Sequence, residues 1–229
     1  VILGFARYLN DTDGIELLSL FYLSNNTDDK QETPDIAVNA SSEFLAVWTR
    51  KKKDINAHFF KRQGQWEFDP GDDFTVSTSA ELKLQPRVAT LGDSFLAVWE
   101  NTASLSEGQI DGRLVLGRES FGGAETRIDD SPAGARLPAV AALRGLSPDR
   151  YLVVWVDGRD GGGRIRGRLL DSAGLPAGPS FPLAQATGEV ARLEVAGSRE
   201  GDDFRRDFVL LWQETGGIRA LLFRIEEQP

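Results

Sequence analysis

The chain has 229 residues, a hydrophobic content of 41% and a formal net charge of −9 at pH 7. This length is enough to bury a large core within one or two domains, and no apolar run approaches the ~18–20 residues that span a bilayer. The acidic balance argues against a nucleic-acid partner, because phosphate binding needs a basic face. The absence of cysteine excludes disulfides and thiolate metal sites.

One aromatic–aliphatic–tryptophan phrase occurs four times along the chain. Its copies lie at 44–48, 95–99, 151–155 and 208–212, and their tryptophans are 51, 56 and 57 residues apart. A recurrence of this kind indicates one supersecondary unit used repeatedly. The near-continuous apolar run in each phrase predicts a strand buried on both faces.

Three further segments flank each phrase in register. A short strand is predicted before it, at 34–38, 86–89, 138–141 and 193–196. A strand beginning with Ile is predicted after it, at 55–60, 110–115, 165–170 and 218–223, and an extra copy of this strand opens the chain at 2–8. Weaker fourth strands are predicted at 18–22, 74–78, 125–128 and 180–183. No helix of two turns or more is expected.

A proline opens the first strand in three of the four copies. These residues are Pro34, Pro86 and Pro138, and Leu193 takes the equivalent place in the fourth copy. Proline is tolerated at the first position of a strand, because no hydrogen bond is lost from the ladder. We therefore expect each first strand to begin at this residue.

Four-stranded antiparallel units repeated in this way are typical of β-propeller blades. We predict an all-β, β-propeller-like fold with about four blades plus part of a fifth. The single domain spans 1–229, with blades near 1–32 (partial), 33–84, 85–136, 137–190 and 191–229 (without its last strand). Both terminal fragments contain a third strand, so the count does not give a closed ring. We expect that the natural polypeptide extends beyond this chain or that residues 1–10 have another role.

The third copy carries a composite motif, Pro-x-Val-Ala followed by Tyr-Leu-Val-Val-Trp-x-Asp and then Ile-x-Gly-Arg-Leu-Leu-Asp-x-x-Gly. Its residues run from Pro138 through Trp155 and Asp157 to Asp171 and Gly174. This motif resembles the repeats of bacterial secreted and cell-surface β-propeller proteins. The resemblance covers nearly the whole chain and implies a binding or scaffolding part of an exported protein, at an extracellular, cell-surface or periplasmic location.

The tryptophans of the repeated phrase are expected to be structural. Trp48, Trp99, Trp155 and Trp212 recur in register, and tryptophan buries a large area where blades meet. Trp66 lies in a polar turn and is either an exposed contact residue or a lid over a blade edge. His58 is the only histidine, and we interpret it as a strand residue without a catalytic or zinc-binding role.

A weak calcium candidate lies near the start of the chain. Asp11, Asp13 and Glu16 place oxygen ligands at alternating or nearby positions around Gly14. The alternative is a plain Asp-Gly hairpin turn. We expect no other cofactor.

The loops after each tryptophan are the candidate binding loops, because the copies stop agreeing there. The residues selected are Arg50, Trp66, Asp157, Arg159 and Asp160. Carboxylates also recur within two residues of three of the tryptophans, at Glu100, Asp157 and Glu214. Paired carboxylates serve glycoside hydrolysis when they lie ~5–10 Å apart.

The functional expectation is a non-catalytic interaction or scaffold module of an exported bacterial protein, which binds a protein partner or a glycan through its rim loops. It is not expected to insert into a membrane, and it could form part of a larger chain or complex. Two alternatives stay open: a carbohydrate-binding, lectin-like propeller, and a glycoside hydrolase that uses rim carboxylates.

Overall fold

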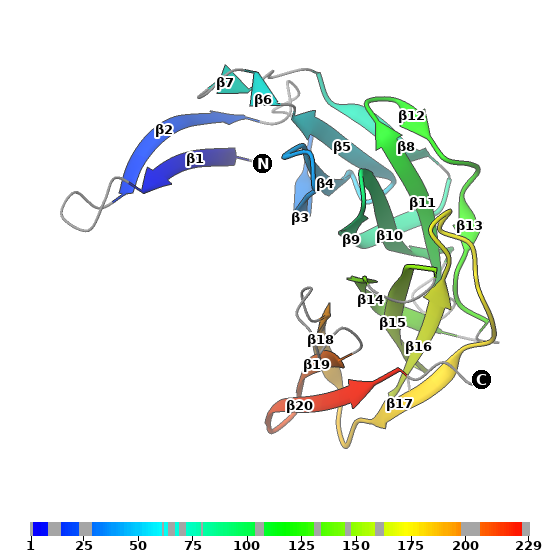
Figure 1. The fold of residues 1–229 in the computed structure, drawn as a ribbon. Helices are drawn as coiled ribbons and strands as arrows, with labels where there is room; N and C mark the ends of the chain where they lie inside the picture. Colours follow the sequence, from blue (N-terminus) through cyan, green and yellow to red (C-terminus); the bar gives the residue numbers. More distant parts are fainter. Residues whose placement is uncertain are drawn as a thin grey trace.

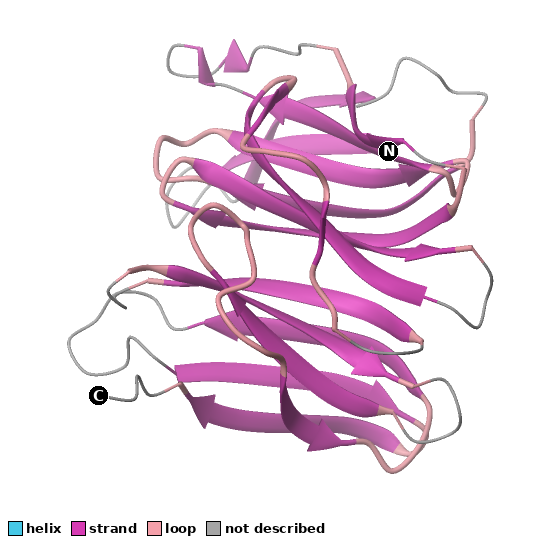
Figure 2. Cartoon of the chain, turned by 90° about the vertical axis from the view of Figure 1, so that its right-hand side faces the viewer, coloured by secondary structure: helices cyan, strands magenta, loops and turns pink. Residues whose placement is uncertain are grey.

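The fold is an all-β propeller of four antiparallel blades, accompanied by two further hairpins (Figure 1). The computed structural model describes residues 2–8, 15–22, 29–60, 62–63, 67–68, 72–78, 80–103, 108–130, 134–144, 148–158, 163–197 and 207–225; for 2–8, 15–22, 62–63 and 67–68 it describes the backbone alone. The sheets stack one after another, and no helix occurs in these ranges (Figure 2). The predicted fold class is confirmed.

The first two blades follow the predicted order of strands. Blade 1 consists of β3 (Gln31–Val38), β4 (Phe44–Arg50), β5 (Asp54–Phe60) and β8 (Phe74–Thr78). Blade 2 consists of β9 (Leu82–Leu91), β10 (Ser94–Thr102) and β11 (Gly108–Gly117), with the short strands β12 (Ser120–Phe121) and β13 (Thr126–Arg127) both pairing with β11.

The remaining strands complete the architecture. Blade 3 consists of β14 (Ala135–Leu143), β15 (Arg150–Asp157), β16 (Arg164–Leu170) and β17 (Phe181–Gln185). Blade 4 consists of β18 (Val190–Gly197), β19 (Asp207–Glu214) and β20 (Gly217–Arg224). Two hairpins stand outside these sheets: β1 (Ile2–Tyr8) with β2 (Ile15–Tyr22), and β6 (Arg62–Gln63) with β7 (Glu67–Phe68).

The innermost strand of every blade lies at the edge of its sheet. β3, β9, β14 and β18 lie nearest the centre of the arrangement, and the outer strands β8, β12, β13 and β17 lie at its periphery (Figure 1). The inner strands contact one another in series, from β3 to β9, β14 and β18. Since an edge strand leaves one row of N–H and C=O groups outside its ladder, four such rows approach the centre.

Three of the repeated tryptophans pack between blades, as predicted. Trp48, Trp99 and Trp155 have no exposed surface and Trp212 is 8% exposed. Trp99 packs with Leu45 and Val47 of blade 1, Trp155 packs with residues of blade 2, and Trp212 packs with residues of blade 3. These three tryptophans therefore join blades 2, 3 and 4 to the blade before each of them.

Burial on both faces is confirmed for three of the four tryptophan-bearing strands. Every residue from Leu45 to Thr49 of β4 is buried, and β10 and β15 are buried almost throughout. β19 differs, because buried and exposed residues alternate along it. Val209 and Leu211 are each 41% exposed, so one face of blade 4 is open among the described residues.

The expectation that each first strand begins at its proline is wrong. β3, β9 and β14 begin three or four residues earlier, and the proline lies at a β-bulge within the strand. At each bulge two residues lie opposite the tryptophan of the neighbouring strand, and neither of them is paired with it in the ladder. These residues are Thr33–Pro34, Gln85–Pro86 and Leu137–Pro138. A bulge tolerates proline because the ladder is already interrupted there.

The residue before each of these prolines has a left-handed backbone. Thr33, Gln85 and Leu137 have φ values of 51°, 51° and 56°. Non-glycine residues adopt this region at a cost of about 1–3 kcal/mol, and it occurs most often where a site must be held in place. After these irregularities the four inner strands share one register. In each of them one residue pairs with the residue that precedes the tryptophan of the neighbouring strand, namely Asp35, Arg87, Ala139 or Glu194.

Candidate functional site

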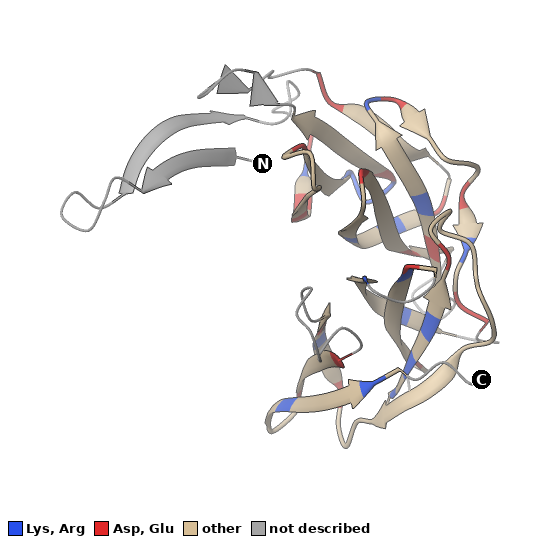
Figure 3. Ribbon diagram, viewed as in Figure 1, with Lys and Arg blue, Asp and Glu red and all other residues tan. Residues whose placement is uncertain are grey.

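Charged residues converge at the centre of the propeller, just after the bulges. Arg87 of β9 donates through Nη2 to Oε1 of Glu194 of β18 over 3.1 Å. These strands belong to blades 2 and 4, so the ion pair crosses the centre. Arg192 also donates from Nε to the same oxygen over 2.9 Å. Charges of both signs thus occur on the inner strands as well as on the periphery (Figure 3).

Asp35 completes this group, which we call the central cluster: Asp35, Arg87, Arg192 and Glu194. Its Oδ2 accepts a 2.9 Å hydrogen bond from the backbone N–H of Val88, on the edge of the next blade. Burial raises the pKa of Asp35 above its ordinary value. The Val88 hydrogen bond and the charge of Arg87 oppose this rise, whereas the charge of Glu194 adds to it.

The cluster therefore holds two carboxylates in different environments. Asp35 is half-buried, and this burial raises its pKa because it penalises the charged form. Glu194 is ion-paired with two guanidinium groups, and 41% of its side chain is exposed. Carboxyl groups placed in contrasting environments are suited to separate acid and base roles.

Part of the predicted binding set falls within the described residues. Arg50 ends β4 and contacts Asp29, just before β3, at 3.8 Å and Asp54 of β5 at 3.3 Å, so its partners lie close to its own blade. Asp157 ends β15 on another blade and is half-buried. No contact joins Arg50 to Asp157, and Trp66, Arg159 and Asp160 lie outside the described residues. Their binding role stays a prediction.

The recurring carboxylates after the tryptophans have structural partners. Glu214 is almost fully buried and accepts hydrogen bonds from the backbone and hydroxyl of Thr187, from Trp212 and from Arg219. These bonds lower the pKa of Glu214 to about 2, and the bond from the Thr187 hydroxyl has the largest effect. Glu100 is buried and accepts from the backbone of Leu137 at 3.4 Å. These two carboxylates therefore fix loops and blade contacts.

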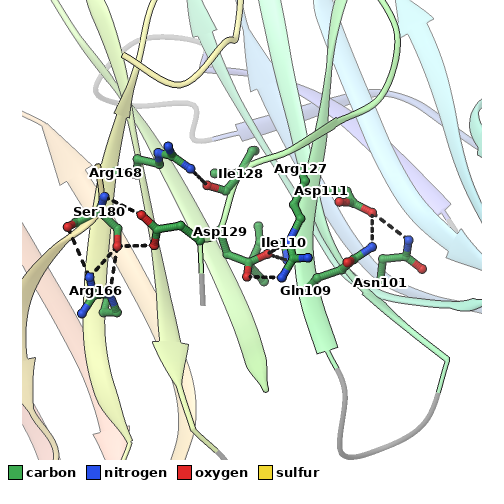
Figure 4. Close-up of polar contacts among 11 residues, drawn as sticks. Asn101, Gln109, Ile110, Asp111, Arg127, Ile128, Asp129, Arg166, Arg168 and Ser180 are labelled. Carbon is green, nitrogen blue, oxygen red and sulfur yellow. Dashed lines mark hydrogen bonds and ion pairs between the residues drawn. The ribbon is translucent and has the colours of Figure 1, made fainter. Parts of the chain in front are cut away.

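A second polar group joins the outer strands of blades 2 and 3 (Figure 4). Asp129 accepts from the N–H of Ile110 at 2.7 Å and from Arg127 at 3.1 Å. Asp130 binds Ser180 of the next blade. Since these carboxylates have donors from the chain itself, we interpret the group as an interblade seam.

The Ile-x-Gly-Arg motif forms part of this seam. Arg168 donates to the carbonyl of Ile128 in the preceding blade at 2.7 Å and to that of Gly178 at 2.6 Å. Arg113, at the same motif position, donates to Val76 of its preceding blade at 2.9 Å and to Gly123 at 3.1 Å. The motif therefore links blades.

The described residues contain no group of three or more His, Asp or Glu side chains that could hold a metal ion. Asp11 and Asp13 lie outside the described residues, as does the side chain of Glu16, so the calcium site stays a prediction. His58 is buried in β5 and stacks on Phe60, in keeping with its structural interpretation. The described part contains no helix with the length and hydropathy of a membrane span.

Comparison with known proteins gives structural likeness without sequence likeness. No protein-family model and no curated protein matches the chain. An α-L-arabinofuranosidase from Fusarium graminearum, solved with an iminosugar inhibitor, has a TM-score of 0.57 at 9% identity; the match covers 90% of this chain and 68% of that one. The NanB sialidase from Streptococcus pneumoniae has a TM-score of 0.58 at 10% identity, over 90% of this chain and 31% of the sialidase.

A family 117 glycoside hydrolase from Zobellia galactanivorans is also similar, with a TM-score of 0.52 at 7% identity over 98% of this chain and 76% of that chain. The identities are low enough that the likeness establishes the propeller fold alone. The expectation of a non-catalytic scaffold module is nevertheless contradicted, because the similar solved propellers described above are glycoside hydrolases and a sialidase. The chain shares the propeller fold with these proteins.

Proposed function

We propose that this propeller hydrolyses glycosidic bonds at its central cluster. The observation that carries the proposal is the placement of two carboxyl groups, Asp35 and Glu194, around Arg87 at the meeting point of the inner strands. Glycoside hydrolysis commonly uses one carboxylic acid to protonate the leaving oxygen and one carboxylate as base or nucleophile. The carbohydrate-active neighbours support the same class of chemistry.

The two roles follow from the two environments. Asp35, with its raised pKa, acts as the general acid. Glu194 acts as the carboxylate base or nucleophile, and Arg87 and Arg192 hold its Oε1 in place. The free edges of the inner strands supply backbone donors and acceptors for sugar hydroxyls.

The test is hydrolysis of a panel of 4-nitrophenyl glycosides by the wild-type chain, Asp35→Asn and Glu194→Gln. Asparagine keeps an oxygen for the N–H of Val88 and loses the acid, so the fold is retained. We expect each variant to lose at least about 100-fold in kcat, which is the contribution of positioned acid–base catalysis. Activity should fall as pH rises through the raised pKa of Asp35, because the acid is then ionised.

The matched control is Asp72→Asn, which removes an exposed carboxylate that forms an ion pair with Arg118 at 3.1 Å. It should retain full activity. Wild-type turnover by Asp35→Asn or Glu194→Gln would contradict the assignment. Glycan binding without hydrolysis of any panel member would favour the lectin-like alternative. The exported location and a protein partner stay predictions.

A further inference from the structure

A separate cavity of about 300 Å³ lies on the same axis, where the inner strands end. All four inner strands contribute to its wall through Ala37, Val38, Ala89, Thr90, Ala142 and Gly197. Residues Ala37 and Ala89 follow Asp35 and Arg87 by two positions, so the cavity begins beyond the central cluster. Ligand pockets span roughly 300–1,000 Å³, and one at the lower end accommodates a single small ring.

The wall of this cavity is formed by small side chains and strand edges. Gly197 comes so close to β14 that an added Cβ would lie 2.9 Å from the carbonyl oxygen of Ala142. Thr90 reaches across from β9 and donates to the carbonyl of Val38 over 3.0 Å. Small side chains leave the backbone accessible, and the edge strands have backbone groups outside their ladders. The wall is therefore suited to neutral hydroxyl groups.

Arg144 is the one ionisable residue among the described residues of the lining. No described residue forms a hydrogen bond or an ion pair with its side chain. Arg144 directly follows β14, and the arginines within the inner strands differ from it. Arg87 and Arg192 contact Glu194, and Arg136 donates to the carbonyl of Val190 at 2.9 Å. A guanidinium that has no counter-ion among the described residues suits a carboxylate, which it binds through two parallel hydrogen bonds.

We propose that this cavity binds one acidic monosaccharide of the uronic-acid class, with the carboxylate on Arg144 and the hydroxyls on the strand edges. The inference concerns binding alone and is independent of the proposed hydrolysis. An acidic saccharide accounts for both the arginine and the strand edges. A small carboxylate without hydroxyl groups would bind Arg144 but would form no hydrogen bonds with the edges of the four strands.

The experiment is calorimetric titration of the chain with D-glucuronate, D-glucose and acetate. Glucuronate should bind at least ten-fold more tightly than either of the others. Arg144→Gln should weaken glucuronate about 10- to 100-fold, which is the range for a hydrogen bond to a charged group, and should leave any glucose affinity unchanged. Arg118→Gln, at a remote exposed position, should bind as the wild type does.

A second variant tests the cavity without altering its charge. Val38 is 48% exposed, so Val38→Trp should fold and should fill the cavity, abolishing glucuronate binding. Equal affinity for glucuronate and glucose, or wild-type binding by Arg144→Gln, would overturn the proposal. Acetate binding as tightly as glucuronate would overturn the sugar assignment. The absence of glucuronate binding by the wild-type chain would also overturn it.

Discussion

Replacing Arg168 by alanine tests whether the Ile-x-Gly-Arg motif holds neighbouring blades together. Arg168 makes two charge-assisted hydrogen bonds, one of 2.7 Å to Ile128 in the preceding blade and one of 2.6 Å to Gly178 in its own blade. A hydrogen bond to a charged group contributes about 1.5–3 kcal/mol. The bond to Gly178 is exposed and contributes less, so the expected loss in the free energy of unfolding is about 2–3 kcal/mol.

The assay is urea unfolding followed by tryptophan fluorescence, supported by a thermal scan. For a chain of this size, such a loss lowers Tm by about 4–12 °C. Arg168→Lys keeps the charge and only one of the two bonds, so it should give an intermediate result. Arg118→Ala removes an exposed ion pair to Asp72 and should cost at most about 1 kcal/mol. If Arg168→Ala and Arg118→Ala unfold at the same urea concentration, the motif does not link the blades.

Two further predictions concern a close approach and a buried carboxylate. Gly112→Ala places a Cβ 2.6 Å from Cδ1 of Ile128 and 3.1 Å from the carbonyl oxygen of Ala97, so it should lower the free energy of unfolding by urea by about 1–3 kcal/mol. Gly123→Ala meets no atom within 4 Å and should leave that free energy unchanged. Equal unfolding midpoints for the two variants would refute the packing argument. Because the pKa of Glu214 is lowered to about 2, its contribution to stability is present above pH 4.5 and is lost as pH falls toward 2. Unfolding midpoints at pH 7 and pH 3 should therefore differ more for the wild type than for Glu214→Gln, and an unchanged difference would contradict this role.

The repeated apolar phrase carries enough information to predict most strands, because its burial in three blades imposes an uninterrupted hydrophobic run. The bulges could not be predicted in the same way. Thr33, Gln85 and Leu137 are different residue types, and none is a glycine or asparagine that would signal a left-handed backbone. A proline inside a strand is unusual, so placing it at the start was the simpler interpretation. The open face of β19 depends on what lies beside the blade, which sequence periodicity does not specify.

The candidate site has a weaker sequence signal than the strands have. Disagreement between the copies predicts function in the loops after the tryptophans, but the same criterion applies to the first strands. Alignment of the first strands shows the same kind of disagreement, with aspartate, arginine, alanine and glutamate at positions 35, 87, 139 and 194. The pairing of Arg87 with Glu194 across two nonadjacent blades requires the three-dimensional arrangement, since 107 residues separate them in sequence.

The side chains that follow the bulges can vary without altering how the blades pack. Four positions share one register, because Asp35, Arg87, Ala139 and Glu194 each pair with the residue that precedes a tryptophan. The first three follow a bulge opposite that tryptophan, whereas in β18 the register shifts between Val190 and Arg192. Blade packing depends on the tryptophans and their apolar neighbours, so it places little demand on which side chain occupies these four places. The propeller thus offers a small combinatorial set of inward positions, in which a lineage or a designer could exchange acids, bases and neutral residues while keeping one scaffold.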